Sequence, residues 1–357
     1  MAFSLFKKKK NRKDDRYQTL TIKEVVNVAK DAVNLVFEKP ESFEYEPGQF
    51  ITIIKEVNGK KIRRAYSLCT TPFEDANPAV TVKRVAGGAM SNDLNDNAKA
   101  GDQMEIMEPM GMFTTEYNEN NNRNAVFLGG GSGITPLMSI IRSILLKEPK
   151  SKTTLVYGNR REEFVIFKEL ISDLEEKYDG RFKVIHILEE GEADYVGRPT
   201  PEMIGEITKD IGVSDQTEYY ICGPQPMMDV VSKGLDLVGV KAGSIRMESF
   251  EAGKTSPDAI IDKGGDSESE VTILLDGEEY SVTVKKNASI LDTALANDLD
   301  MPYSCQSGLC TACRGKCVEG QVSIDEAEGL SQDELDEGYV LTCIGKPLTD
   351  RVRVEMG

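Results

Sequence analysis

The chain has 357 residues, with 60 acidic and 43 basic side chains and a formal net charge of -17 at pH 7. This length allows two or three domains, and the acidic excess argues against nucleic-acid binding. No apolar run approaches the roughly 18 residues of a membrane span, and seven cysteines, an odd number, disfavour a disulfide framework. A protein of the reducing cytoplasm, without an integral membrane segment, is therefore expected.

Residues 1–17 are predicted to form a basic flexible tail, because the lysines from Lys7 to Lys10 begin a short charge run of the kind that is usually solvated. Contact of this tail with anionic lipid or nucleic acid is the alternative. Residues 18–118 contain short alternating apolar runs, such as Phe50 to Ile54, separated by Pro, Gly and Asn turns. This pattern predicts an antiparallel β-barrel.

The pattern changes in residues 119–250, where apolar strands alternate with amphipathic helices, which predicts an α/β domain with a parallel sheet. Residues 251–270 are rich in Gly, Ser, Asp and Lys and are expected to form a linker. In residues 271–357 two apolar runs flank Asp276-Gly277, which predicts a β-hairpin. A helix is expected from about Ser289 to Asn297.

Four cysteines in this last segment carry the most specific signal. Cys305, Cys310 and Cys313 have the spacing C-x4-C-x2-C, and Cys343 follows after 29 intervening residues. This is the plant-type [2Fe–2S] ferredoxin spacing. Zinc is the main alternative, but zinc sites favour paired C-x2-C knuckles, and only one such pair is present. Cys317 is interpreted as a spare thiol.

Three motifs in the first two segments indicate sites for phosphate groups and aromatic rings. The first comprises Arg64, a fork for a diphosphate, Tyr66, a flat face for a ring, and Ser67, and it is followed by the glycine turn at Gly87, Gly88 and Ser91. The second is the glycine-rich run 129–136, placed between a predicted strand and a helix as phosphate binding requires. The third is the run Cys222-Gly223-Pro224 at a strand end, where ligands bind in open α/β sheets.

In this order, the motifs resemble those of the ferredoxin–NADP reductase superfamily with an appended plant-type ferredoxin domain. The resemblance covers nearly all of the chain from about Gln18 to Gly357. It implies a flavin β-barrel, a nicotinamide-binding α/β domain and a β-grasp ferredoxin domain. The order of the domains is similar to that of the reductase component of phenylacetyl-CoA epoxidase, of hybrid-cluster protein reductases and of other oxygenase reductases.

The resemblance also implies roles for individual residues. Tyr66 is expected to stack on the isoalloxazine ring and Ser67 to bind near flavin N5. The flavin phosphates would be held by Arg64, Gly87, Gly88 and Ser91. The nicotinamide subsite would be lined by Gly131, Gly133, Thr135, Cys222 and Gly223. The run Glu248-Ser249-Phe250 is similar to the family's Glu-x-Phe near the flavin, with a core role for Phe250 as the alternative. FAD is favoured over FMN.

The dinucleotide is predicted to be NADPH, with NADH as the alternative. Arg160 and Arg161 follow a predicted strand at the place where the adenine ribose should lie, and a guanidinium there can bind a 2′-phosphate. Glu162 and Glu163 are the competing partners of these arginines.

Together these predictions describe an NAD(P)H-dependent oxidoreductase. Nicotinamide gives two electrons and a two-iron cluster accepts one at a time, so a flavin is expected between them. The partner is expected to be an electron-accepting protein, with an oxygenase component of the phenylacetyl-CoA epoxidase type leading and hybrid-cluster protein as the alternative. A flavin and iron–sulfur redox sensor and a zinc-stapled scaffold are the competing classes.

Overall fold

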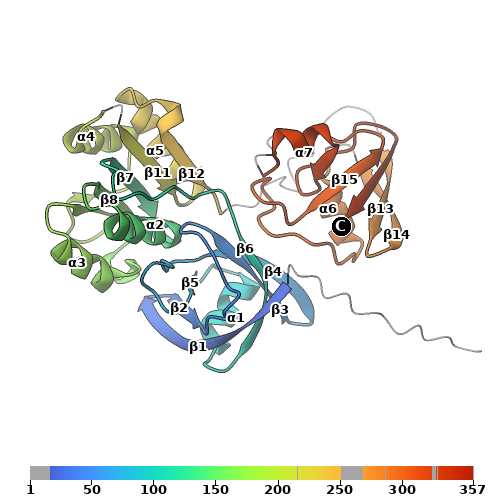
Figure 1. Ribbon diagram of the computed structural model, residues 1–357, viewed down its shortest axis with the longest axis horizontal. Helices are drawn as coiled ribbons and strands as arrows, with labels where there is room; N and C mark the ends of the chain where they lie inside the picture. Colours follow the sequence, from blue (N-terminus) through green and yellow to red (C-terminus); the bar gives the residue numbers. More distant parts are fainter. Residues whose placement is uncertain are drawn as a thin grey trace, which may run out of the picture.

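The structure is a computed structural model that describes residues 17–214, 216–250, 268–285, 287–323, 327 and 329–356. Figure 1 shows three parts in chain order, coloured from blue through green and yellow to red. The predicted three-domain fold is confirmed. No helix in the described ranges has the length and apolar character needed to cross a membrane.

Two predicted boundaries differ from the structure. The first strand already begins at Tyr17, within the expected tail, and a strand of the third part begins at Glu268, within the expected linker. Residues 268–270 join the sheet because they pair with residues 283–285 of the hairpin. The rest of the predicted tail, 1–16, and of the predicted linker, 251–267, lies outside the described residues.

The first part is a curled antiparallel sheet with the strand order β4-β3-β6-β1-β2-β5. An antiparallel bridge between Leu68 and Val80 closes this sheet into a barrel, and its interior is filled by buried residues such as Leu20, Leu35 and Ile53. Its elements are β1 (Tyr17–Ala29), β2 (Ala32–Phe37), β3 (Phe50–Val57), β4 (Lys60–Ser67), β5 (Ala79–Lys83), α1 (Ala89–Asn97) and β6 (Gln103–Met110).

The second part is a parallel sheet with the order β10-β9-β8-β7-β11-β12. The chain runs from β7 to β8 on one side and later returns to place β11 on the other, so the topological switch point lies between β7 and β11. Its elements are β7 (Asn124–Gly130), η1 (Gly131–Gly133), α2 (Ile134–Lys147), β8 (Lys152–Asn159), η2 (Glu162–Phe164), α3 (Lys168–Lys177), β9 (Phe182–Leu188), β10 (Tyr195–Val196), α4 (Pro201–Ile211), β11 (Thr217–Cys222), α5 (Gln225–Leu237), η3 (Ala242–Ser244) and β12 (Ile245–Glu248).

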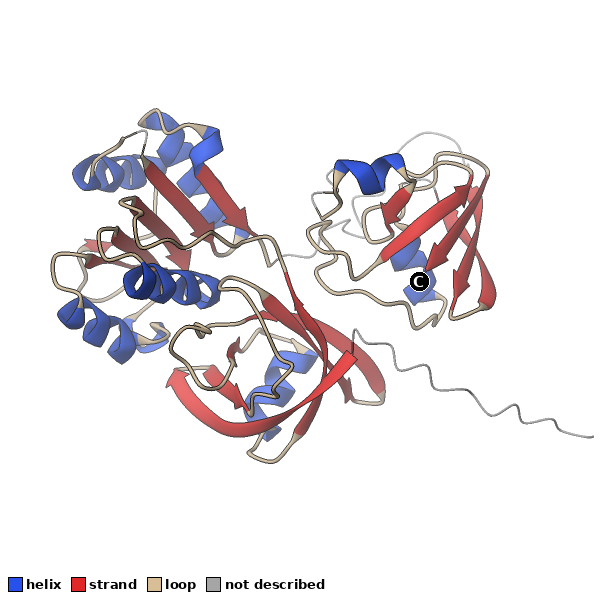
Figure 2. Cartoon of the chain, in the orientation of Figure 1, coloured by secondary structure: helices blue, strands red, loops and turns tan. Residues whose placement is uncertain are grey.

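Helices cover both faces of this sheet, as Figure 2 shows. Apolar residues of α2 and α3 pack on one face, and those of α4 and α5 pack on the other. The barrel contributes Ala32, Cys69 and Phe113 to the cluster around α2. The first two parts therefore share a hydrophobic core, which fixes the edge of the barrel beside the carboxyl ends of β7 and β11.

The third part is a mixed five-stranded sheet with the order β14-β13-β17-β15-β16. The predicted hairpin is confirmed, and Asp276 and Gly277 both have positive φ, as a type I′ turn requires. The predicted helix is also present, and the Ser289 side chain caps it by accepting a bond from the Asp292 N–H. Its elements are β13 (Glu268–Leu275), β14 (Glu278–Lys285), α6 (Ile290–Ala296), β15 (Arg314–Glu319), α7 (Gln332–Asp336), β16 (Tyr339–Leu341) and β17 (Arg351–Met356).

Candidate functional site

The four predicted cluster ligands lie together as two pairs of thiols. The Sγ atoms of Cys305 and Cys310 are 3.1 Å apart, and the Cys313 and Cys343 thiols interact with each other. In the described ranges no three His, Cys, Asp or Glu side chains meet closely enough to bind a single metal ion. Two pairs suit a two-iron group, in which each iron takes two thiolates, better than one tetrahedral zinc.

Residues 305–313, the cysteine loop, carry three of the four thiols and supply donors to sulfur, whereas Cys343 lies after β16. The Cys310 thiol and the Ser307 backbone N–H both donate to the Cys305 sulfur, and these bonds lower the pKa of Cys305. The same thiol–thiol bond raises the pKa of Cys310, so the pair shares one proton between two sulfurs. Cys317 lies apart from this group on β15, where its thiol donates to the Glu319 carbonyl.

The predicted phosphate turn of the barrel leads into an uncapped helix. Gly87 has a φ of +72°, and Gly88 is the N-cap of α1, with no side-chain bond to the first turn. The Ser91 hydroxyl accepts a bond from the Val85 N–H at 3.1 Å, so Ser91 holds the turn. The free backbone N–H groups at this helix start are suited to an anion.

Two glycine-containing turns are locked together at the switch point. A Cβ on Gly133 would lie 2.0 Å from the Cys222 carbonyl oxygen, and one on Gly130 would lie 2.3 Å from the Met227 sulfur. The Thr135 hydroxyl donates to the Ser132 carbonyl at 3.0 Å, which fixes the start of α2. Only glycine at position 133 allows this approach, and it brings the predicted nicotinamide residues of η1 and α2 beside Cys222 at the end of β11.

Lys83 is a candidate nucleotide-binding residue that the sequence analysis missed. Its Nζ lies 2.9 Å from the position that a Cβ on Gly131 would take, so the amine faces the glycine-rich turn from the barrel. Burial, followed by the charge of Arg160, lowers the pKa of Lys83. Lys83 therefore places a cation from the barrel beside the turn of the second domain, where it is suited to a phosphate group, and Arg160 is close enough to act on its charge.

The two predicted arginines have different surroundings. Arg161 pairs with Glu190 at 2.7 Å, whereas Arg160 makes no ion pair with any residue of the described ranges. Glu162 pairs with Lys168 and Glu163 with Lys30, so these two glutamates do not neutralise the arginines. The positive charge of Arg160 is thus left for a ligand.

One cavity of about 250 Å³ is lined by all three domains. Arg64 and Ser67 reach it from β4, Phe250 from the chain after β12, and Cys305 from the cysteine loop. The volume lies below the roughly 300–1,000 Å³ of most ligand pockets, so it suits a flat ring rather than a whole dinucleotide. The full set of lining residues is Phe50, Arg63, Arg64, Ala65, Ser67, Glu248, Ser249, Phe250, Ser304, Cys305, Gln306 and Leu309.

Glu248 is a buried carboxylic acid in the wall of this cavity. Its side chain is 6 % exposed and lies between Ser67 and Cys305, while its backbone pairs with Cys222. Burial first, and then the charge of Cys305, raise the pKa of Glu248 to about 8. Its Oε2 atom has no partner in the described part of the chain, so the cavity offers a buried carboxyl group to the polar edge of a bound ring.

Tyr66 does not line this cavity. Its half-buried side chain packs against the core of the barrel, and burial raises the pKa of its hydroxyl. Its stacking on a flavin ring stays a prediction. Phe250 is 46 % exposed, which is incompatible with the alternative of a core phenylalanine.

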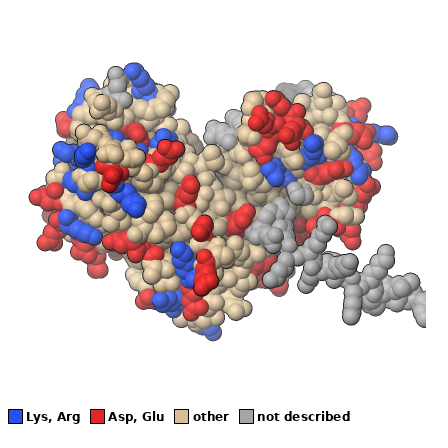
Figure 3. Space-filling view, in the orientation of Figure 1, with Lys and Arg blue, Asp and Glu red and all other residues tan. Residues whose placement is uncertain are grey.

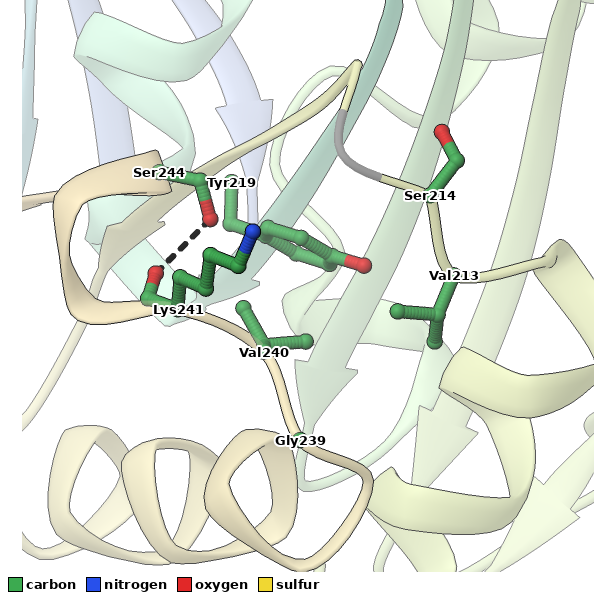
Figure 4. Close-up of a pocket in the computed structure, with 7 residues that line it drawn as sticks. All are labelled: Val213, Ser214, Tyr219, Gly239, Val240, Lys241 and Ser244. Atoms are coloured by element: carbon green, nitrogen blue, oxygen red, sulfur yellow. Dashed lines mark hydrogen bonds between the residues drawn. The ribbon is translucent and has the colours of Figure 1, made fainter.

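A separate cavity of about 310 Å³ lies at the opposite edge of the parallel sheet (Figure 4). Its lining includes Val213 and Ser214, which precede β11, and Gly239, Val240, Lys241 and Ser244, which precede β12. These are the amino ends of parallel strands, whereas Cys222 lies at the carboxyl end. This cavity is therefore not part of the nucleotide site.

The residues present fit all three expected groups. The orphaned Oε2 of Glu248 and the small cavity suit a flavin ring, the Lys83 amine beside the Gly131 turn suits a dinucleotide phosphate, and the paired thiols suit an iron–sulfur cluster. Fold and site together define a modular electron-transfer oxidoreductase.

Family models for a flavin-binding, a nicotinamide-binding and an iron–sulfur domain match the three parts of the chain. An oxidoreductase FAD-binding domain matches residues 19–115, an oxidoreductase NAD-binding domain matches 127–233, and a 2Fe–2S iron–sulfur cluster binding domain matches 273–348. The chain therefore has FAD-binding, NAD-binding and 2Fe–2S domains, in the predicted order.

Two curated relatives match almost end to end. The ferredoxin reductase component of 3-ketosteroid-9-alpha-monooxygenase from Rhodococcus rhodochrous is 35 % identical, over 94 % of this chain and 96 % of the relative. A component of 1,2-phenylacetyl-CoA epoxidase from Escherichia coli is 32 % identical, over 95 % and 97 %. The fold matches that of phthalate dioxygenase reductase with a TM-score of 0.60 and 23 % identity, over 96 % of this chain and 98 % of that one. The chain belongs to the family of flavin-dependent reductases that carry a C-terminal [2Fe–2S] ferredoxin domain.

Proposed function

We propose that this protein is the reductase component of an oxygenase system and transfers electrons from NADPH to a separate oxygenase protein. When bound, a flavin would supply hydride acceptance from the nicotinamide and a [2Fe–2S] cluster would supply one-electron transfer to the acceptor. The observation that supports this path is the cavity at which the barrel, the end of β12 and the cysteine loop meet. The oxygenase acceptor is inferred from the relatives, which are a reductase component of a monooxygenase and a component of an epoxidase.

The residues around the cavity have separable roles in this proposal. Arg64 and the start of α1 would hold the flavin phosphates, and Ser67 with Glu248 would face the reacting edge of the ring. The turns at Gly131 and Cys222 would place the nicotinamide. Cys305 lines the same cavity and is a predicted cluster ligand, so it would lie on the path of electrons from the ring to the cluster.

The preference for NADPH rests on Arg160. It directly follows β8 and has no ion-pair partner among the described residues, and a guanidinium at this place can bind a 2′-phosphate. Arg160→Ala should lower kcat/KM for NADPH by roughly tenfold and change the value for NADH much less, since hydrogen bonds to charged groups are worth about 1.5–3 kcal/mol. An equal loss with both nucleotides would contradict the assignment.

An acidic surface beside the cysteine loop supports a basic acceptor. The four acidic residues of 333–337 lie on or just after α7, and Figure 3 shows acidic side chains gathered over this helix. The Gly329 N–H donates to the Gly308 carbonyl at 2.7 Å, which places the start of this region against the loop. Complementary charge of this kind steers weak, salt-sensitive encounters.

The variant Cys310→Ser tests whether the flavin and the cluster have separate roles in electron transfer. Removing one cluster ligand should abolish NADPH-driven reduction of an acceptor that needs the cluster, such as the purified oxygenase or cytochrome c. Reduction of ferricyanide at the flavin should stay largely intact. Cys317→Ser, which changes a thiol outside the group, is the matched control. Loss of both activities in a folded variant would refute the proposed path.

We also infer a cytoplasmic location. The described thiols are all free, including buried Cys69 and Cys222, and proteins of reducing compartments keep their thiols in this state.

A further inference from the structure

The ferredoxin domain is docked on the outer face of the barrel through its cysteine loop. Phe50 and Ile54 of β3 and Met107 of β6 form a buried apolar cluster with Cys310 and Ala312. Figure 1 shows the same arrangement, with β3 and β4 facing the ferredoxin domain. Both faces of β3 are therefore covered, one by the barrel core and the other by the ferredoxin domain.

Polar contacts surround this apolar cluster. The hydroxyl groups of Thr52 and Ser304 are hydrogen-bonded in a buried position. The Arg63 guanidinium lies 5.3 Å from the centre of the Tyr303 ring, which is within the range of a cation–π interaction. Tyr303 and Ser304 directly precede Cys305 in the sequence, so their contacts with the barrel hold the first part of the cysteine loop.

An ion-pair cluster holds the rim of the interface. Arg63 Nη1 donates to Asp300 Oδ1 at 2.6 Å, and Lys61 Nζ lies 3.3 Å from the other Asp300 oxygen. The Arg63 side chain is only 4 % exposed, whereas that of Asp300 is 59 % exposed. Asp300 is therefore the counter-charge of a buried cation and is also open to water and salt.

The burial of Arg63 makes the free energy of docking sensitive to the loss of Asp300. Removing one partner of a buried charge strongly destabilises the contact, because the other charge is left unpaired. Arg63 Nε already has no partner among the described atoms, so loss of Asp300 would leave the guanidinium with little compensation. Salt screens the pair because one side is exposed, so docking should weaken as ionic strength rises.

We propose that Asp300 is a positioning residue that clips the cysteine loop onto the barrel beside the flavin cavity, and that release of this clip uncovers the loop for the electron acceptor. While the clip is closed, Cys310 and Ala312 are buried against the barrel, so an acceptor cannot reach this side of the loop. The inference rests on the proposed electron path for its functional meaning, but the docking itself is measurable without it.

Asp300→Asn tests the clip, with Asp298→Asn as the matched control. Asp298 lies in the same turn, is exposed and forms no ion pair with the described residues. X-ray scattering of the flavin- and cluster-loaded protein should show a larger radius of gyration for Asp300→Asn at low salt. Wild type should approach that value at about 1 M salt, where the Debye length is about 3 Å, and Asp298→Asn should behave as wild type.

Rapid-mixing kinetics provide the second readout. After mixing with NADPH, Asp300→Asn should reduce its flavin at the wild-type rate and its cluster roughly tenfold more slowly, because an uncompensated Arg63 disfavours docking. Asp300→Glu should restore both the compact form and the rate. Unchanged scattering and cluster reduction in Asp300→Asn would overturn the proposal, as would equal slowing of flavin and cluster. If NADPH does not reduce wild-type flavin, the proposed function fails, and the scattering comparison alone decides the clip.

Discussion

At the scale of single residues, the buried carboxyl of Glu248 sets a pH dependence. Burial raises its pKa from 4.5 to about 8, so the folded protein keeps a proton that the unfolded chain releases above about pH 4.5. The stabilisation from this proton is complete below the unfolded pKa and is lost as the pH rises through about 8. Each pKa unit between the folded and unfolded states corresponds to about 1.4 kcal/mol of unfolding free energy.

Glu248→Gln should therefore flatten the stability profile. Because glutamine does not titrate, the variant should lose less unfolding free energy than wild type between about pH 5 and about pH 9. Thermal unfolding of the loaded protein at a series of pH values measures this difference. The exposed Glu56→Gln variant is the control. Parallel profiles for wild type and Glu248→Gln would show that this group is not buried as a neutral acid.

Lys83 leads to a prediction about nucleotide affinity. Lys83→Met keeps the length of the side chain but removes the cation beside the Gly131 turn, so KM for NADPH should rise roughly tenfold or more. Ferricyanide reduction measures KM, and unfolding temperature and flavin content should not change. Lys30→Met, which breaks a surface pair with Glu163, is the control. An unchanged KM in Lys83→Met would remove this residue from the site.

Sequence patterns identified the residues whose role depends on local spacing. The cysteine loop and the glycine turns are contiguous or nearly so, and their chemistry is readable in one stretch. Lys83 and Asp300 carry no such signal, because each acquires its partners from a different domain. The resemblance to a Glu-x-Phe motif near the flavin included Glu248, but its burial between Ser67 and Cys305 depends on the tertiary arrangement and could not be read from the motif.

At the scale of elements, the meeting of two turns at the switch point is the feature most sensitive to substitution. A methyl group on Gly133 would lie 2.0 Å from the Cys222 carbonyl oxygen, and no side-chain rotation relieves contact with backbone. The two turns must move apart, and overpacking of this kind costs about 1–3 kcal/mol. The nucleotide edge should be displaced with them.

Gly133→Ala should thus impair reduction by NADPH by roughly tenfold or more while leaving chemical reduction of the bound cofactors by dithionite unchanged. Gly243→Ala is the matched control, because a Cβ there meets nothing within 4 Å. Anaerobic spectra with each reductant separate the two effects. Normal NADPH reduction in Gly133→Ala would show that the turns are not held as closely as described.

The strand β3 shows what alternation in the sequence can and cannot reveal. The apolar run Phe50 to Ile54 predicts a strand, and a strand is present. Its burial pattern is continuous rather than alternating, however, with Phe50, Ile51, Thr52, Ile53 and Ile54 all buried. A continuous apolar run indicates that both faces of the strand are buried. Only the tertiary arrangement shows that the ferredoxin domain buries the outer face.

At the scale of the whole molecule, three domains converge on one small cavity. The order of domains was predictable because each has its own periodicity and motif. The convergence was not, because it depends on the packing of the barrel against α2 and of the cysteine loop against β3 and β6. These interfaces bring residues of the barrel, the end of β12 and the cysteine loop to the same cavity.

The central claim is an ordered transfer from nicotinamide to flavin to cluster, and an anaerobic visible spectrum during separate titration with NADPH and NADH tests it most directly. Flavin and iron–sulfur absorption should bleach in sequence, with NADPH the more effective nucleotide. A protein whose flavin and cluster absorption is absent, or is not bleached by either nucleotide, would contradict the account.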